Sequence, residues 1–311
     1  MYRKKSFDKI NLRRKRTSNF DIDINLVISK KYLNVLKILK DLHYFDLLQK
    51  SKGLIKLIEG PIITAGKIKY TLKIFLPYKR KYLLKKIILP KKLDISKELF
   101  YFLGLSFGDG AGKNRVGIIN TNENLLKYTF IFLSKFFNKN EILGSIFVTN
   151  KKEMKKIRTY KKKLKALGIS TEINIVKNFH ARGNVVYSIY VNCQPFAKIL
   201  YFIIFNIDKI WDKIDQNLKN SFLAGLFDAE GNVNARDKNL RISQQEEKNK
   251  SIINEILKQE NYHFRYDGAN FVIGNRKETR TDDFKKFEKQ VLPYLKHENK
   301  YYKASLLIKN L

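Results

Sequence analysis

Several features on which secreted and membrane proteins depend are missing from this sequence. Its 311 residues include one cysteine, Cys193, which excludes an internal disulfide and a zinc site built on cysteine ligands. The four histidines are scattered without the spacing of metal ligands. The longest apolar run, residues 199–205, is far shorter than the roughly 20 residues of a membrane-spanning helix. No membrane partner is therefore expected.

The amino terminus also lacks a secretory signal. Residues 1–15 are basic, but no apolar segment follows within them. An intracellular location is expected, either cytoplasmic or nucleoid-associated, and an organellar location stays open.

Acidic residues are scarce. The chain has 29 Asp and Glu against 63 Lys and Arg, which gives a formal charge of +34. A balance this far from zero predicts a polyanionic partner, and nucleic acid is the first candidate. The hydrophobic content of 44% is high enough for folded cores rather than disorder.

One nine-residue pattern occurs twice, as FLGLSFGDG at residues 102–110 and as LAGLFDAEG at residues 223–231. Each copy has two small residues four positions apart, which a helix places on one face. These pairs are Gly104 with Gly108 and Gly225 with Ala229. Small residues on one face allow two helix backbones to approach closely, so we expect the two copies to pack against each other.

Each copy has an acid next to its last glycine, Asp109 in the first and Glu230 in the second. Two helices packed side by side with matching ends would bring these carboxylates together. Carboxylates held close together repel, and a divalent cation commonly relieves that repulsion. The sequence therefore predicts a metal site with one acid from each half.

The second copy closely resembles the signature of the LAGLIDADG homing endonucleases, and the first is similar at its Gly, Leu and Gly-Asp-Gly positions. Phe107 departs from the pattern, because the family usually has an acid there. The resemblance covers roughly residues 96–311. It implies an α+β fold of two pseudo-symmetric αββαββα units, whose antiparallel sheets form a DNA-binding saddle. It also implies a monomer with an internal pseudo-two-fold axis.

The resemblance also implies roles for particular residues. Asp109 and Glu230 would hold Mg²⁺, and the backbone carbonyls of Gly108 and Ala229 would complete its coordination. Polar side chains at the end of the strand after each signature would position water. A basic residue is expected in the loop before the last helix of each unit. The polar and basic positions that match in this sequence are Gln244, Asn120, Lys300 and, as a guess for the first unit, Lys209.

The chain divides into three predicted parts. Residues 1–95 form an extension with a helix at 30–48, a strand at 67–75 and a basic stretch at 78–92, which is either an accessory nucleic-acid-binding domain or a folded cap. Residues 96–213 form the first unit, with elements at 116–120, 123–137, 171–177, 185–191 and 195–205 and an additional Lys-rich segment at 138–168. Residues 214–311 form the second unit, with elements at 232–235, 240–244, 248–259, 263–266, 270–274, 283–295 and 300–308.

Alternation along residues 240–245 places Leu240 and Ile242 on the helix-covered face of the predicted sheet. The residues between them then face the DNA, where Arg and Gln suit contacts with guanine and adenine edges. The predicted DNA contacts are Arg241, Ser243 and Gln245, with Arg115 and Arg265 as weaker candidates.

These features together predict a site-specific endonuclease that makes metal-dependent breaks in both strands of a long DNA target. An alternative on the same fold is a maturase that binds intron RNA, since the positive charge suits RNA equally well. A transcription factor built on the fold is disfavoured, because both acids are retained.

Overall fold

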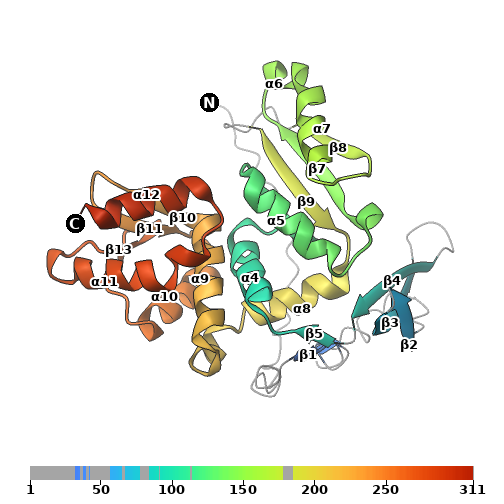
Figure 1. The fold of residues 1–311 in the computed structure, drawn as a ribbon, viewed down its shortest axis with the longest axis horizontal. Helices are drawn as coiled ribbons and strands as arrows, with labels where there is room; N and C mark the ends of the chain where they lie inside the picture. The colour runs from blue at the N-terminus through green and yellow to red at the C-terminus, as the bar shows by residue number, and fades with distance from the viewer. Residues whose placement is uncertain are drawn as a thin grey trace, which may run out of the picture.

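The computed structural model describes residues 32–35, 38–39, 42, 57–64, 67–77, 84–90, 92–112, 114–177 and 185–310. Two α+β units lie on either side of a central pair of helices, and a small N-terminal sheet lies to one side (Figure 1). The predicted α+β fold class is confirmed. Among the described residues, no helix is both long and apolar enough to cross a membrane.

The central pair consists of α4 (Lys97–Asp109) and α9 (Gln216–Glu230), the two helices that contain the repeated pattern (Figure 1). The side chain of Ser96 caps the first turn of α4, and that of Asp215 caps α9. A β-carbon added to Gly104 would lie 2.0 Å from the carbonyl oxygen of Phe222, and one added to Gly225 would lie 2.1 Å from that of Tyr101. The two backbones are therefore in direct contact at these glycines.

The first unit has a four-stranded sheet in the order β6-β9-β7-β8. Helices α5 and α8 pack against β6 and β9, while α6 and α7 extend the helix layer over β7. The elements are β6 (Val116–Asn120), α5 (Glu123–Ser134), β7 (Leu143–Val148), α6 (Lys151–Lys155), α7 (Ile157–Ala166), β8 (Ile173–Lys177), β9 (Val186–Val191) and α8 (Gln194–Ile204).

Strand β7 was not predicted from the sequence, which assigned no strand within residues 138–168. It lies between β9 and β8, and it runs parallel to β8. The sheet is therefore antiparallel except at that pair. A parallel neighbour requires a crossover, and the Lys-rich helices α6 and α7 supply it.

The second unit has a four-stranded antiparallel sheet in the order β10-β11-β13-β12. Lys238 in the hairpin turn has a φ of 48°, the left-handed conformation that tight hairpins need. The predicted elements are all present, and α11 begins six residues earlier than expected. They are β10 (Gly231–Asn234), β11 (Asn239–Ser243), α10 (Glu247–Gln259), β12 (Phe264–Tyr266), β13 (Asn270–Ile273), α11 (Lys277–Gln290) and α12 (Glu298–Lys309).

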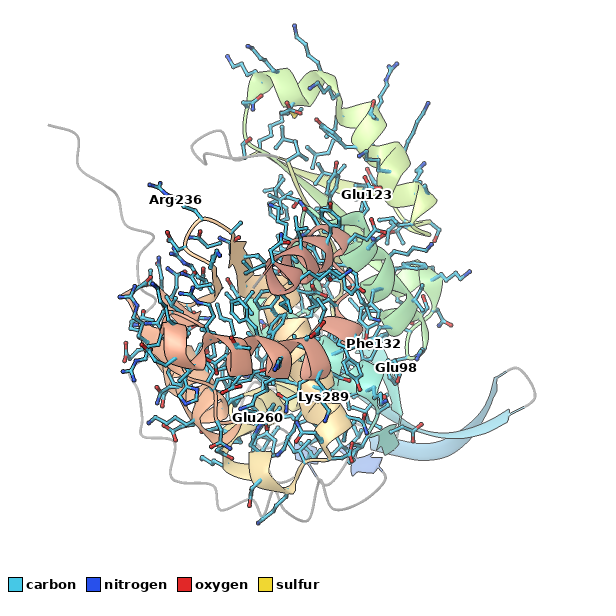
Figure 2. The ribbon with its side chains drawn as sticks, turned by 60° about the vertical axis from the view of Figure 1, so that its left-hand side comes forward. Glu98, Glu123, Phe132, Arg236, Glu260 and Lys289 are labelled. Atoms are coloured by element: carbon cyan, nitrogen blue, oxygen red, sulfur yellow. The ribbon has the colours of Figure 1, made fainter. Side chains whose placement is uncertain are left out.

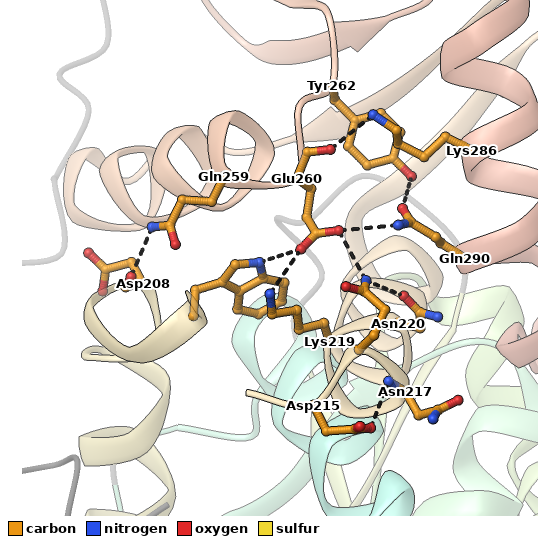
Figure 3. Close-up of polar contacts among 12 residues, drawn as sticks. Asp208, Asp215, Asn217, Lys219, Asn220, Gln259, Glu260, Tyr262, Lys286 and Gln290 are labelled. Carbon is orange, nitrogen blue, oxygen red and sulfur yellow. Dashed lines mark hydrogen bonds and ion pairs between the residues drawn. The ribbon is translucent and has the colours of Figure 1, made fainter. Parts of the chain in front are cut away.

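A buried carboxylate, Glu260, fastens the segment between the units to the second unit (Figure 3). Its oxygens accept hydrogen bonds from Trp211 Nε1 at 2.8 Å, Gln216 Nε2 at 3.1 Å and Gln290 Nε2 at 3.3 Å. Lys219 Nζ lies 3.6 Å away and supplies the compensating charge. The buried acid is thus paired and hydrogen-bonded, as a buried charge must be.

The N-terminal part contains the meander β2 (Leu57–Thr64), β3 (Lys67–Pro77) and β4 (Leu84–Pro90). The strand predicted at residues 67–75 lies within β3. The helix predicted from residue 30 is wrong at its start, because β1 (Tyr32–Asn34) pairs there with β5 (Lys92–Asp94). Val35, Ile38 and Leu39 are helical and fully buried, and the rest of that prediction lies outside the described residues.

Candidate functional site

The two acids of the repeated pattern are the last residues of the central helices, Asp109 in α4 and Glu230 in α9. A β-carbon added to Gly108 would lie 2.5 Å from Glu230 Cγ and 2.7 Å from Ala229 Cβ. Only a residue without a side chain leaves room there for the acid of the opposite helix. The close helix contact therefore brings the two carboxylates to one place.

This arrangement makes the acids hard to ionise. Burial raises the pKa of Asp109 to about 7, and repulsion from Glu230 acts in the same direction. A hydrogen bond from Asn120 Nδ2 to Asp109 Oδ2, at 2.5 Å, partly opposes the rise. Burial also raises the pKa of Glu230. Two half-buried acids of this kind are suited to binding a cation, which would stabilise their charged forms.

Lys300 is the cation that the chain itself places at this end of the helix pair. It lies in the first turn of α12 rather than in the loop before that helix, where the sequence had placed it. Its ammonium donates to the carbonyl oxygens of Phe227 at 3.1 Å, Asp228 at 2.7 Å and Ala229 at 3.3 Å. Burial lowers the pKa of Lys300, and attraction to Asp228, Asp109 and Glu230 opposes the decrease.

Asn120 and Gln244 occupy matching places at the ends of β6 and β11. Asn120 Oδ1 accepts from the backbone N–H of Asn122 at 2.7 Å, and Gln244 Oε1 accepts from that of Glu246 at 3.0 Å. The Asn120 amide donates to Asp109, while Gln244 and Glu230 line one cavity. Asn120 therefore contacts the acid of its own unit, and Gln244 shares a cavity with the acid of the second unit.

Asp228 is a site residue that the sequence prediction missed. It is fully buried, and its Oδ2 accepts from the hydroxyl of Tyr101, from Lys296 N at 2.7 Å and from His297 N at 3.3 Å. The acid thus joins α4 to the residues just before α12. Its place in the second copy, where the first copy has Phe107, was the signal in the sequence.

A cavity of about 350 Å³ opens beside Glu230, between the two units. Lys198 and Tyr201 of α8 line it opposite Glu230 and Gln244. Lys209, expected at the first site, instead bonds Asn206 Oδ1 at 3.1 Å and lies near Lys248. Lys198 is therefore the better placed lysine of the first unit.

The predicted DNA contacts of the second unit lie on one sheet face. Strand register places Arg241 and Arg265 on either side of Val272, opposite the buried face that contains Leu240 and Ile242. Ser243 Oγ donates to Asn270 Oδ1 at 2.7 Å, and Gln245 is exposed just beyond the strand. The face is almost entirely polar; its members are Asn232, Asn234, Asn239, Arg241, Ser243, Arg265, Asn270 and Val272.

The corresponding face of the first sheet is less polar. It includes Ile119, Phe147 and Tyr190, with Ser145 and Ser188 between them. Arg115 lies over the ring of Tyr190, 4.5 Å from its centroid. The two faces are therefore unequal, and charged and amide side chains are concentrated on the face of the second unit.

The oxygen atoms at the acids fit a hard divalent cation. The described residues contain no group of three or more His, Cys, Asp or Glu side chains that could hold a metal. A site here would rely on one carboxylate from each helix and on carbonyl and amide oxygens. Mg²⁺ suits such a site, because it commonly keeps several waters and binds through one or two carboxylates and phosphate oxygens.

The raised pKa of Asp109 has a measurable consequence for stability. Its carboxyl binds a proton more tightly in the folded chain, at about 7, than at the ordinary value of 3.8. Between these values the folded state holds more protons, so lowering the pH from about 8 to about 5 should raise the Tm of the metal-free protein. Thermal unfolding in EDTA should show a weaker rise for Asp109→Asn. Equal pH dependence in both proteins would contradict the raised pKa.

Comparisons with known proteins agree with the sequence pattern in the second unit. The family model of the LAGLIDADG-like domain matches residues 217–291. A search of curated proteins found no match. Solved structures of similar shape include mesophilic variants of the homing endonuclease I-DmoI, at 19% identity over 61% of this chain and 94% of that one, with a TM-score of 0.36. I-DmoI in complex with DNA and Mn has 18% identity over 63% and 96%, with a TM-score of 0.34.

The matched residues contain α9 with Glu230, the polar strand β11 and Gln244. The chain thus carries a LAGLIDADG-like domain at residues 217–291.

Proposed function

We propose that this protein is a site-specific endonuclease that uses divalent cations to cut both strands of a long duplex DNA. The observation that supports this most is the convergence of Asp109 and Glu230 at the ends of two helices in backbone contact. A pair of half-buried acids with raised pKa values would lower the stability of the metal-free fold, so a purely structural role does not explain them. The polar sheet face beside them offers a surface for the major groove, which admits β-ribbons.

The chain's own residues have distinct parts in this reaction. The carboxylates of Asp109 and Glu230 hold the cation, and the amide of Asn120 orients Asp109 through their hydrogen bond. Lys300, near both acids, places a positive charge where a scissile phosphate would lie. A bound Mg²⁺ would activate water and neutralise charge on the leaving oxygen. The carbonyls of Gly108 and Ala229 remain candidate ligands, although that of Ala229 already accepts from Lys300.

Cleavage of a randomised duplex library tests this function. We expect one long sequence to be cut on both strands when Mg²⁺ is present and not when EDTA replaces it. Sequencing the cut ends reveals the target and the stagger between the two breaks. Absence of cleavage with Mg²⁺ and with Mn²⁺, in protein that is folded, would overturn the proposal.

Binding of structured RNA is a second candidate function, which the crossover helices favour. Residues 151–165 contain nine basic side chains and one acid, Glu153, and most of the basic side chains are exposed. Figure 2 shows many side chains of α6 and α7, at the top of the view, projecting away from the sheet. Leu164 and Tyr160 pack on the face of the first sheet that α5 also covers. The basic side chains of α6 and α7 therefore lie on the side of that sheet opposite its proposed DNA-facing surface. Target DNA bound on the opposite faces of the two sheets would not contact the basic side chains of α6 and α7.

Neutralising basic side chains on α6 and α7 tests RNA binding separately from DNA cleavage. The quadruple variant Lys151→Gln, Lys152→Gln, Lys155→Gln and Arg158→Gln should lower the salt dependence of RNA binding by about three counterions. DNA cleavage should stay unchanged. The matched control neutralises four exposed lysines of the second unit, Lys258, Lys277, Lys285 and Lys289. If both quadruple variants affect RNA equally, the crossover helices are not an RNA surface.

A further inference from the structure

The two halves of the site differ at one pair of positions. Residues 121 apart correspond in the two copies of the pattern, as Asp109 does to Glu230. Tyr101 therefore corresponds to Phe222, and Asp228 corresponds to Phe107. At Asp228 of α9 the pair is a buried hydrogen bond, which Tyr101 of α4 donates. In the first unit it is an edge-to-face contact of Phe107 and Phe222, with ring centroids 6.3 Å apart.

The two helices also differ in what surrounds the residues just before their terminal acids. The carbonyls of Phe227, Asp228 and Ala229 all accept from Lys300. The corresponding residues of α4, Ser106, Phe107 and Gly108, all line the cavity of about 350 Å³. At the end of α9 three carbonyl oxygens fix a lysine in place, whereas the equivalent residues of α4 line an open cavity together with Lys198.

Asp228 links these two observations. Its Oδ2 accepts the backbone N–H groups of Lys296 and His297, which directly precede α12. Lys300 follows within the first turn of that helix. The carboxylate therefore fixes the start of the helix that carries the lysine. An aromatic ring, as at Phe107, has no oxygen to accept these N–H groups.

We propose that Asp228 is a positioning residue that holds Lys300 against the acids, so that the centre at the end of α9 is preassembled and the centre at the end of α4 is not. This inference rests on the proposed endonuclease activity. Its consequence is that the two DNA strands are cut at unequal rates, and a duplex nicked in one strand accumulates before the double-strand break. A misplacement of about 1 Å can cost roughly a hundredfold in rate, so unequal positioning is enough to separate the two steps.

The test transfers the pair of the first unit to the second. The double variant Tyr101→Phe with Asp228→Phe reproduces the Phe222 and Phe107 pair, which this fold already accommodates. Each strand of the target duplex carries its own label, and the rate of cleavage is measured for each strand. We expect the faster strand to slow by at least about tenfold and the ratio of the two rates to approach one, with DNA affinity unchanged.

A second readout does not depend on cleavage. Lys300 is half-buried and its ammonium donates to three carbonyl oxygens, so an amine-labelling reagent followed by mass spectrometry should modify it slowly in the wild-type protein. Labelling of Lys300 relative to the exposed Lys209 should increase in the double variant. Asp228→Asn retains an oxygen that accepts backbone N–H groups, and it should restore most of the protection and of the rate difference.

The matched control is Asp283→Asn. Asp283 is also a buried acid of the second unit that accepts a backbone N–H, that of His263 at 3.0 Å. It should change neither the strand ratio nor the labelling of Lys300. Equal strand rates in the wild-type protein, or equal slowing of both strands without increased labelling, would overturn the proposal. If the wild-type protein cuts neither strand, the endonuclease function fails, and the labelling alone decides whether Asp228 positions Lys300.

Discussion

Replacing either acid of the helix pair should abolish double-strand cleavage while the protein still binds its target. Asp109→Asn and Glu230→Gln each remove one of the two charges that would hold a cation at the scissile phosphates. Loss of a group that stabilises developing charge commonly lowers the rate by roughly a hundredfold to a thousandfold, and a metal ligand should be at the upper end. The sheet face that would contact DNA is not changed by either substitution.

Plasmid cleavage and fluorescence anisotropy, with Mg²⁺ present, measure the two properties separately. The control is Glu288→Gln, which neutralises an exposed acid of α11 outside the site. Because burial raises the pKa of both site acids, the amides should leave the metal-free protein at least as stable as the wild type. Unfolding of either variant would instead show that the acid is needed for the structure, and unchanged cleavage would remove it from the mechanism.

The second large effect is on stability and comes from the glycines between the helices. A β-carbon in Gly104→Ala would lie 2.0 Å from the Phe222 carbonyl oxygen, and one in Gly225→Ala would lie 2.1 Å from that of Tyr101. Both neighbours are backbone atoms and cannot move aside as a side chain can. Alanine would gain about 1 kcal/mol from helix propensity. Separation of the helices should cost at least about 3 kcal/mol, so each variant should be less stable than the wild type.

Urea unfolding measures this loss, and Gly144→Ala is its control. A β-carbon at Gly144 would meet the side chains of Ile169 and Leu164 at 3.3 Å, which can shift by a few tenths of an ångström. A wild-type unfolding midpoint for Gly104→Ala and Gly225→Ala would mean that the helices are not in backbone contact.

Local pattern was enough to predict most of the second unit. The alternation of Leu240 and Ile242 placed β11 correctly, and the apolar spacing of residues 248–259 placed α10. Strand β7 was missed because it lies in a segment whose lysines dominate its composition, although residues 142–148 contain an apolar run of strand length. Its parallel pairing with β8 depends on a crossover that no local signal specifies.

The site residues divide in the same way, into those that local pattern predicts and those that only tertiary packing brings together. Asp109 and Glu230 lie within the repeated pattern, and Asn120 and Gln244 lie at the end of the strand that follows each copy, so a linear reading finds them. The bond between Tyr101 and Asp228 joins residues 127 positions apart, and only the packing of α4 on α9 brings them together. Lys300 was chosen as the basic residue expected before the last helix of the second unit, but its three carbonyl partners could not be read from the sequence.

The position of Lys300 in the last described helix also bears on how the protein becomes active during synthesis. Both acids and all four strands of the second sheet precede α12 in the chain. A nascent or proteolytically shortened chain that ends before Glu298 would already contain the polar face of the second sheet, but it would lack the ammonium of Lys300. Such a product should occupy DNA without breaking it. On the proposed function, strand scission would therefore wait until α12 has been translated.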